Sequence, residues 1–429
     1  MFFLERFKRE KIADGVYFNT IYDDRFKTSR ILVSMLTDID RDRCAANSAV
    51  AGLLVHSCKA YPSFLDLSRK LDSLYGTTLS GSSSKRGDSQ LVNVSAVGIS
   101  DAYSLDGESV YEEMAKLLCG ALFEPNVSDG AFKEEDFRQE QRQLIDTIDA
   151  QFNDKRAYAK KRFLEIMCKD EKYGVNLCGT KEQVSALTST DVYKAYLELI
   201  KTARVEIVCL CANDTENIRN IFRECFANVD RAPAYTDTLI IPRANEVKEH
   251  TDRVDVVQSK LMLGFRTDCA EPDENVDAAK LMSAVLGGTA HSKLFNNVRE
   301  KLSLCYYCVS GYDPNKGVLT VESGVEQENI EKTKAAILNE LEQMKQGNIT
   351  DEELASAKLS MANSYLTSVD SSAGTQGWYL AQVLKGKTLT PQEQAQRINA
   401  VTKEQVVAAA NRLTLDTVYV LTGSGKEGE

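Results

Sequence analysis

The sequence LGGTAHSKLFNNVREKLSLCYYCVSGYDPNKG spans residues Leu286–Gly317 and decides the fold. The apolar, aromatic run LSLCYYCVS is typical of a β-strand, and the polar YDPNKG that follows is typical of a hinge between two strands. Arg299 lies near the end of a predicted helix and Tyr306 lies at the start of the predicted strand. A turn between them can aim both side chains into one cleft.

The order of elements around this stretch occurs twice along the chain, which indicates an internal repeat. Each half contains a strand, a helix, a short helical piece, strands around a polar hinge, three further helices and a final strand. The predicted elements of the first half are Arg30–Leu36, Asn47–Lys59, Leu91–Val97, Val110–Leu122, Glu134–Asp149 and the strand VEIVCLC. Those of the second half are Lys260–Arg266, Val276–Leu286, Tyr306–Ser310, Val318–Val325, Ile330–Met344, Asp351–Tyr365 and the strand VYVLTG.

The last helix of each half begins with the same local signal. Thr188 and Thr402 are predicted N-caps, and Asp191 and Gln405 follow three positions later, as in a capping box. The same solution at the same place in both halves favours a duplication.

A linker is predicted at residues 231–250, which include Pro233, Pro242 and the charged run ANEVKEH. It separates an N-terminal domain, 1–230, from a C-terminal domain, 251–429, and both lengths suit single domains. The sequence therefore predicts an α+β protein with two duplicated domains, each an antiparallel-rich β-sheet with helices packed on one face.

Composition excludes several classes of protein. The 429 residues carry a formal net charge of -11, which argues against nucleic acid as the main partner. Charges interrupt the N-terminal MFFLERFKRE, so it lacks the apolar core of a signal peptide. No run approaches the roughly 18 apolar residues that a membrane span needs. We expect a soluble, cytoplasmic protein with no membrane contact.

Histidine and cysteine usage limits the metal chemistry. The chain has three histidines, His56, His250 and His291, and no two lie within helical reach of each other. Cys305 and Cys308 form a single C-x-x-C within the predicted strand. Positions three apart on a strand face opposite sides, so we expect no metal or redox role for this pair.

The Leu286–Gly317 stretch resembles the pitrilysin/insulinase family of zinc metallopeptidases, in which a glycine-containing loop is followed by V-R-E-K-L-G-L-x-Y. The residues that match this family's pattern are Ser292, Leu294, Phe295, Val298, Arg299, Glu300, Lys301, Leu302, Leu304 and Tyr306. Ser303 stands where the family usually has glycine. The resemblance implies the fold of insulinase and of the mitochondrial processing peptidase over essentially the full chain.

The same resemblance implies a zinc site with an H-x-x-E-H motif on the helix after the first strand, and a further glutamate on a later helix. Aligned at His56, this chain has Gly52 in place of the first histidine and Val55 in place of the general base. On the later helix, Glu140 is followed seven residues on by Thr147, where the family typically has the ligand glutamate. These degenerate positions leave no catalytic residue and no metal ligand set. His56 is then expected to be a half-buried, hydrogen-bonded residue.

The residues that remain imply a role in substrate binding. In the family, a partner domain or subunit supplies an Arg and a Tyr seven residues apart, which match Arg299 and Tyr306. Gly287 and Gly288 can let a peptide backbone approach closely. The alternatives are that Arg299 pairs with an acidic neighbour, that Tyr306 packs in the sheet, and that the glycines end a helix.

The resemblance thus implies a non-catalytic subunit of a heterodimeric insulinase-like zinc peptidase, inactive alone and without a cofactor of its own. An intact insulinase-like subunit would supply the zinc, and the substrate would be a peptide or unfolded protein. One alternative is a scaffold or peptide-binding protein with no role in proteolysis. Another is an active peptidase with relocated ligands, which three unpaired histidines disfavour.

Overall fold

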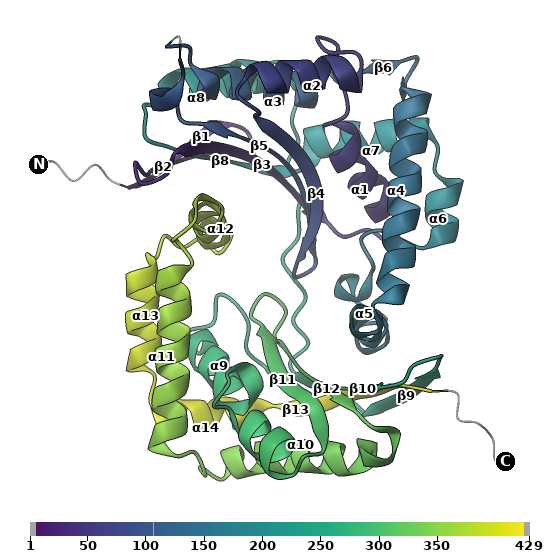
Figure 1. The fold of residues 1–429 in the computed structure, drawn as a ribbon, viewed down its shortest axis with the longest axis vertical. Coiled ribbons are helices and arrows are strands. Elements are labelled where there is room, and N and C mark those ends of the chain that lie inside the picture. The colour runs from purple at the N-terminus through teal and green to yellow at the C-terminus, as the bar shows by residue number, and fades with distance from the viewer. Residues whose placement is uncertain (1–5, 106, 424–429) are drawn as a thin grey trace, which may run out of the picture. The chain divides into compact units, whose positions relative to one another are not determined.

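The computed structural model describes residues 6–105 and 107–423 (Figure 1). Contacts divide these residues into two units. Unit 1 contains the residues up to Ala150, Val175–Asp237 and Val369–Leu384. Unit 2 contains Gln151–Gly174, Thr238–Ser368 and the residues from Lys385 onward. The domain boundary expected near residues 231–250 stays a prediction.

Unit 1 is built on a six-stranded sheet with the order β1-β2-β8-β3-β5-β4. Only the β2–β8 pair in it is parallel, so the sheet is mostly antiparallel. Its edges are β1 and β4. The strands are β1 (Phe7–Ala13), β2 (Val16–Tyr22), β3 (Thr28–Asp38), β4 (Thr78–Arg86), β5 (Ser89–Ile99) and β8 (Arg204–Cys211). A separate small hairpin consists of β6 (Val127–Ser128) and β7 (Ala131–Phe132).

Helices cover both faces of this sheet, because successive side chains of a strand point to opposite sides. Ile31 and Val33 of β3 pack with α1, α3 and α7 in the main core. Leu32, between them, packs in a second cluster with Tyr379 of α12. The helices of unit 1 are α1 (Cys44–Leu53), α2 (Phe64–Ser73), α3 (Val110–Phe123), most of α4 (Glu134–Asn153), α6 (Lys181–Ala186), α7 (Ser189–Thr202), α8 (Glu216–Ala227) and α12 (Ser372–Val383).

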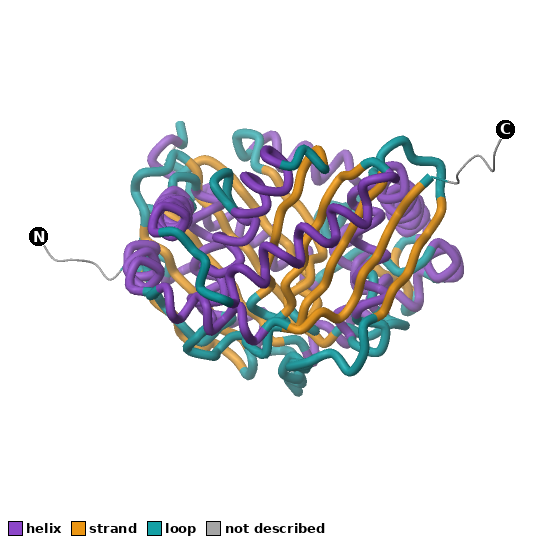
Figure 2. Tube along the Cα trace, turned by 90° about the horizontal axis from the view of Figure 1, so that it is seen from below, coloured by secondary structure: helices purple, strands orange, loops and turns teal. Residues whose placement is uncertain are grey.

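Unit 2 repeats this plan on a five-stranded sheet with the order β11-β12-β10-β13-β9, in which only β13–β9 is parallel. Its strands are β9 (Lys248–Arg253), β10 (Ser259–Arg266), β11 (Cys305–Asp313), β12 (Val318–Val325) and β13 (Thr414–Thr422). Leu261 and Leu263 of β10 pack with α9, α10 and α14. Met262 lies in a cluster with Phe163 of α5 on the opposite face. Figure 2 allows the layering of helices on strands to be followed within each unit.

The helices of unit 2 include two π-helical segments, a form that is often found at functional sites. These are η3 (Ala284–Gly288) and η4 (Leu294–Lys301). The α-helices are α5 (Lys155–Met167), α9 (Val276–Ser283), α10 (Ile330–Lys345), α11 (Asp351–Thr367), α13 (Pro391–Ala400) and α14 (Lys403–Arg412). Unit 2 also has the single 3-10 turns η2 (Lys172–Gly174) and η5 (Gln327–Asn329). A third such turn, η1 (Asp101–Tyr103), lies in unit 1.

The predicted fold class is confirmed: two antiparallel-rich sheets carry packed helices. One feature of the layers was not predicted from the sequence. The second face of each sheet carries a helix from the other half of the chain, α12 in unit 1 and α5 in unit 2. The capping boxes predicted at Thr188 and Thr402 are both present.

Two local predictions are wrong. The helix expected over Asn47–Lys59 ends at Leu53, and the chain then turns into short bridges made by Cys58. The C-x-x-C cysteines do not face opposite sides of their strand. In the β11–β12 ladder Cys305 pairs with Val325 and Tyr307 with Gly324, so Tyr306 is an extra residue, a β-bulge. A bulge shifts the alternation of side chains by one position.

A buried charged group holds the segment after α5 against the sheet of unit 2. Arg266 of β10 donates through Nε to Asp416 Oδ2 (2.7 Å) and through Nη2 to Glu171 Oε1 (2.7 Å). Lys316 Nζ lies 2.8 Å from the other oxygen of Glu171. Arg266 is 2% exposed and Lys316 fully buried, so the two carboxylates need both cations as partners.

Among the helices of residues 6–105 and 107–423, none is long and apolar enough to cross a bilayer.

Candidate functional site

The degenerate zinc-motif residues Gly52, Val55 and His56 line a cavity of about 280 Å³ in unit 1. It lies where the end of α1, the edge strand β4 and helix α4 meet, and Gly52, His56, Gly81 and Glu140 are among its lining residues. Gly81 of β4 is pressed against α1: a Cβ there would overlap the carbonyl oxygen of Ala51. The sheet edge and α1 therefore meet without a side chain between them.

Glu140 occupies the space that a side chain at position 52 would need. A Cβ built on Gly52 would overlap the carboxyl group of Glu140. The same carboxyl group lies 3.7 Å from His56, measured from Oε2 to Nε2. A histidine and a glutamate, two residue types that the family uses as zinc ligands, thus lie side by side here. The carboxyl group of Glu140 fills the space that a histidine side chain at position 52 would take.

Burial disfavours the charged form of both groups. It raises the pKa of the Glu140 carboxyl to about 7. Burial also lowers the pKa of the His56 imidazole, although Asp136 opposes this. The two groups lie within ion-pair distance at 3.7 Å, but burial disfavours the charged forms that an ion pair needs. The predicted half-burial of His56 agrees with this setting, with Glu140 and the ring of Phe64 as its neighbours, whereas the 3.7 Å to Glu140 is too long for the hydrogen bond that was also expected.

The other degenerate positions lie differently. Val55 and His56 are in the turn after α1 rather than on the helix, and Val55 packs against the apolar core. Thr147 is exposed on α4, and its hydroxyl donates to the backbone oxygen of Gln143. Thr147 does not line the cavity, so Glu140 is the residue of α4 that reaches His56.

This donor set does not fit a catalytic zinc ion. Such a site needs three protein ligands and a nearby base for the metal-bound water. The cavity is lined by His56, Glu140 and Cys178, with glycine and valine where the family has a ligand and the base. Throughout the part of the chain that the structure describes, no group of three or more His, Cys, Asp or Glu side chains is placed to hold a metal.

The second candidate site lies in unit 2, at the turn between η4 and β11. Arg299 donates through Nε to the backbone oxygen of Tyr306 (2.9 Å), so the two predicted residues are in direct contact. Its Nη1 lies 3.1 Å from Glu300, and its guanidinium stacks over the ring of Phe295 at 4.6 Å. Ser303 in this turn has a φ of 50°, the left-handed region, which explains why glycine suits the position.

Tyr306 is the extra residue of the β-bulge and is 60% exposed. Its hydroxyl donates to Glu326 Oε1 at 2.7 Å, and this hydrogen bond raises the pKa of Tyr306. Tyr306 therefore does not pack in the sheet, whereas Arg299 does have the acidic neighbour that the alternative interpretation expected. A bulge that turns a side chain outward is common next to functional sites.

Gly287 and Gly288 play different parts in this region. Gly287 is buried, and a Cβ there would lie 2.6 Å from the backbone nitrogen of Ser310 in β11. Gly288 is exposed, and a Cβ built on it would lie 3.3 Å from the backbone oxygen of Ser283. Neither glycine has a positive φ, so they do not end the helix in the left-handed way. Gly287 allows η3 to pack closely against the edge strand.

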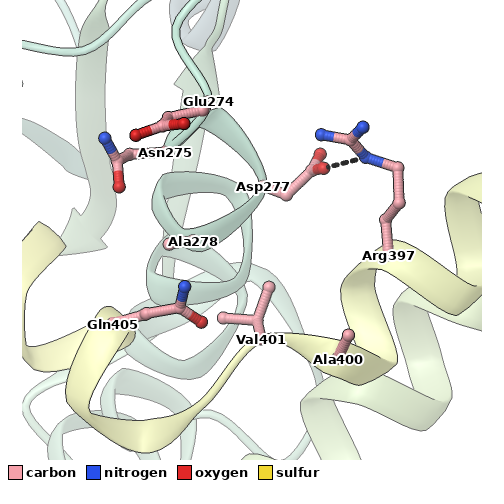
Figure 3. A pocket seen from close by; sticks show the side chains of 8 residues that line it. All are labelled: Glu274, Asn275, Asp277, Ala278, Arg397, Ala400, Val401 and Gln405. Carbon is pink, nitrogen blue, oxygen red and sulfur yellow. Dashed lines mark hydrogen bonds and ion pairs between the residues drawn. The ribbon is translucent and has the colours of Figure 1, made fainter.

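Another cavity, of about 200 Å³, lies between α9 and helices α13 and α14 (Figure 3). Arg397 donates through Nε to Asp277 Oδ2 at 2.7 Å across this cavity, and Gln394 also donates to Asp277. These contacts satisfy the buried carboxylate and join the helices. No residue predicted to act on a substrate lies there.

Comparison with known proteins agrees with this geometry. Residues 186–361 match the family described as Peptidase M16 inactive domain. The chain is 28% identical to the Bacillus subtilis protein named probable inactive metalloprotease YmfF, over 96% of each chain. It is 25% identical to the uncharacterized zinc protease YmxG of the same organism, over 56% of this chain and 58% of that protein.

Solved structures extend the likeness to the whole chain. A conserved protein from Enterococcus faecalis V583 matches 99% of this chain and all of its own, with a TM-score of 0.92 and 27% identity. A Pseudomonas fluorescens structure described as a peptidase M16 inactive domain shares the fold, with a TM-score of 0.80 at 16% identity. The chain is thus similar over its whole length to M16-type peptidases and their inactive homologues, and residues 186–361 match the M16 inactive domain.

Proposed function

We propose that this chain is the non-catalytic subunit of a heterodimeric M16-type zinc peptidase. An M16 subunit with an intact H-x-x-E-H motif supplies the metal and the base, and this chain supplies part of the peptide-binding surface. The observation that carries the proposal is the side-chain set of the unit 1 cavity, where Gly52 and Val55 leave His56 and Glu140 without a third ligand or a base. A chain with this cavity cannot hydrolyse a peptide bond by the family's zinc chemistry.

Peptide binding is supported by the two sheet edges. A free edge strand presents unpaired backbone groups to which an extended peptide can add as a further strand. Strand β4 is such an edge in unit 1 and β11 is one in unit 2. Tyr306 stands out from β11 beside Arg299, whose guanidinium can donate to peptide carbonyl oxygens. In this proposal Arg299 and Tyr306 bind the peptide, buried Gly287 lets η3 pack close to β11, and exposed Gly288 leaves room for a peptide backbone.

The test uses the full chain mixed with an M16 chain of similar length that retains H-x-x-E-H and is encoded in the same genome. We expect a one-to-one complex by light scattering, and cleavage of fluorogenic peptides that neither chain achieves alone. Arg299→Ala should lower kcat/KM by about tenfold to a hundredfold, the value of a hydrogen bond from a charged donor. Arg243→Ala, at an exposed position outside the site, is the matched control.

A scaffold or peptide-binding role without proteolysis is the second candidate. It is favoured by the contacts that Arg299 and Tyr306 make within their own unit, to Glu300 and Glu326, which leave them already partnered. A complex with the intact chain whose cleavage is the same with Arg299→Ala as with Arg243→Ala would favour this role. Absence of any complex with an intact M16 chain would contradict the heterodimer.

A further inference from the structure

The β-bulge at Tyr306 brings two thiols to the same side of the edge strand. Without the extra residue, Cys305 and Cys308 would point to opposite faces. With it, Cys308 belongs to the main apolar core of unit 2, and Cys305 packs against that same core. The two side chains therefore share one environment, next to the turn that carries Arg299.

The pair is asymmetric in the way that a dithiol redox pair requires. Cys305, the first residue of β11, is half-buried, whereas Cys308 is 1% exposed. A hydrogen bond from the Cys308 thiol lowers the pKa of Cys305 to about 7, with further help from Ser323 and the nearby charge of Arg299. The same bond and burial raise the pKa of Cys308. The less buried sulfur is thus the one that forms a thiolate more readily, whereas the buried one keeps its proton.

We propose that Cys305 and Cys308 form a redox-active thiol pair that hydroperoxides oxidise reversibly, with Cys305 as the attacking sulfur and Cys308 as the resolving one. One other pair, Cys119 and Cys225, also combines a buried thiol with a half-buried thiol whose pKa is lowered. Of the eleven, Cys178 and Cys225 are the others that are not buried. Cys225 has a thiol neighbour, Cys119, but on a different helix and without an adjacent arginine in contact with it.

The chemistry proceeds in two balanced steps. The Cys305 thiolate attacks the terminal oxygen of a hydroperoxide, the O–O bond breaks, and the alkoxide or hydroxide that leaves takes up a proton. This step leaves a sulfenic acid on Cys305. The sulfur of Cys308 then attacks Cys305, the S–O bond breaks, and the thiol proton leaves with the hydroxide as water. Two electrons pass from the two sulfurs to the peroxide, and a small dithiol restores both thiols by exchange.

Oxidation would also move the residues assigned to peptide binding; this consequence rests on the proposed function. Tyr306 lies between the two cysteines, and its backbone oxygen accepts the hydrogen bond of Arg299. A disulfide would constrain the backbone on both sides of Tyr306, and the backbone oxygen of Tyr306 is the acceptor of the Arg299 hydrogen bond. We therefore expect the oxidised complex to cleave peptides more slowly than the reduced one.

The pair can be tested by mass spectrometry on the full chain, because trypsin should release Leu302–Lys316, LSLCYYCVSGYDPNK, which contains both cysteines and no other. After brief hydrogen peroxide treatment and alkylation, this peptide should lack two hydrogens and carry no alkyl group. Dithiothreitol before alkylation should restore two alkylated cysteines. In Cys308→Ser, dimedone should label Cys305 as a sulfenic acid. Cys178→Ser, at another half-buried cysteine, is the control and should leave the disulfide yield unchanged.

The proposal is overturned if peroxide leaves both cysteines of this peptide open to alkylation, or if Cys305 gives no dimedone adduct in Cys308→Ser. Iodoacetamide labelling of untreated protein at pH 7 offers a second check, since Cys305 should react before Cys178, which is half-buried like Cys305. These readouts need no partner and no peptide substrate. Their failure is therefore separate from failure of the heterodimer, which is measured by complex formation and cleavage.

Discussion

Replacing Glu140 with glutamine isolates the effect of holding a carboxyl group in the unit 1 cavity. Glutamine keeps the shape that fills the space beside Gly52, but it cannot ionise. Burial raises the pKa of Glu140 to about 7 in the folded chain, against an ordinary value of about 4.3 in an unfolded one. The energy that corresponds to this difference is on the order of 3 kcal/mol.

Whether the free energy of unfolding rises or falls with pH depends on which state, folded or unfolded, holds the proton of Glu140. Below about pH 4.3 the carboxyl group is protonated in both states, so its full contribution to stability is present. Between that pH and about 7 the unfolded chain releases the proton and the folded chain keeps it. The free energy of unfolding contributed by Glu140 therefore falls as the pH rises, and the loss is complete above pH 7.

Urea unfolding followed by circular dichroism at pH 5, 6, 7 and 8 measures this effect. The free energy of unfolding of Glu140→Gln, relative to the natural chain, should increase by about 2–3 kcal/mol from pH 5 to pH 8. Glu135→Gln, at a side chain of the same helix that is 83% exposed, should show a difference that does not change with pH. A constant offset for Glu140→Gln across this range would refute the argument that burial keeps this carboxyl group protonated.

Three further outcomes follow from the structure. Gly52→Ala should lower the free energy of unfolding by about 1–3 kcal/mol in urea unfolding, because its Cβ would overlap the carboxyl group of Glu140; a loss below about 0.5 kcal/mol would show that Glu140 does not fill this space. Arg266→Ala should destabilise unit 2 by about 3–5 kcal/mol in urea unfolding, since it leaves two buried carboxylates short of a partner, and a loss below about 1 kcal/mol would exclude that role. Thr402→Ala should lower the free energy of unfolding by about 1 kcal/mol through loss of a capping box, while Thr402→Ser should keep most of it.

Much of the fold was predictable because its signals are local. The strand Val318–Val325 has the predicted bounds, and the helix at Val110 begins where predicted and ends one residue later, since periodicity and capping depend on neighbouring residues. The layers were less predictable. Which helix covers the second face of a sheet depends on contacts between distant segments, as with Phe163 of α5 and Met262.

Some features of the candidate site were likewise determined by the sequence, and others only by the tertiary structure. The absence of a ligand at Gly52 and of a base at Val55 is a matter of residue type, so the sequence alone determined it. That Glu140, and not Thr147, reaches His56 was decided by the packing of α4 on α1, which motif spacing cannot show when insertions blur an alignment. The placement of two cysteines on one side of β11 was likewise decided by the tertiary structure, because a β-bulge arises from how two strands pair and not from either strand alone.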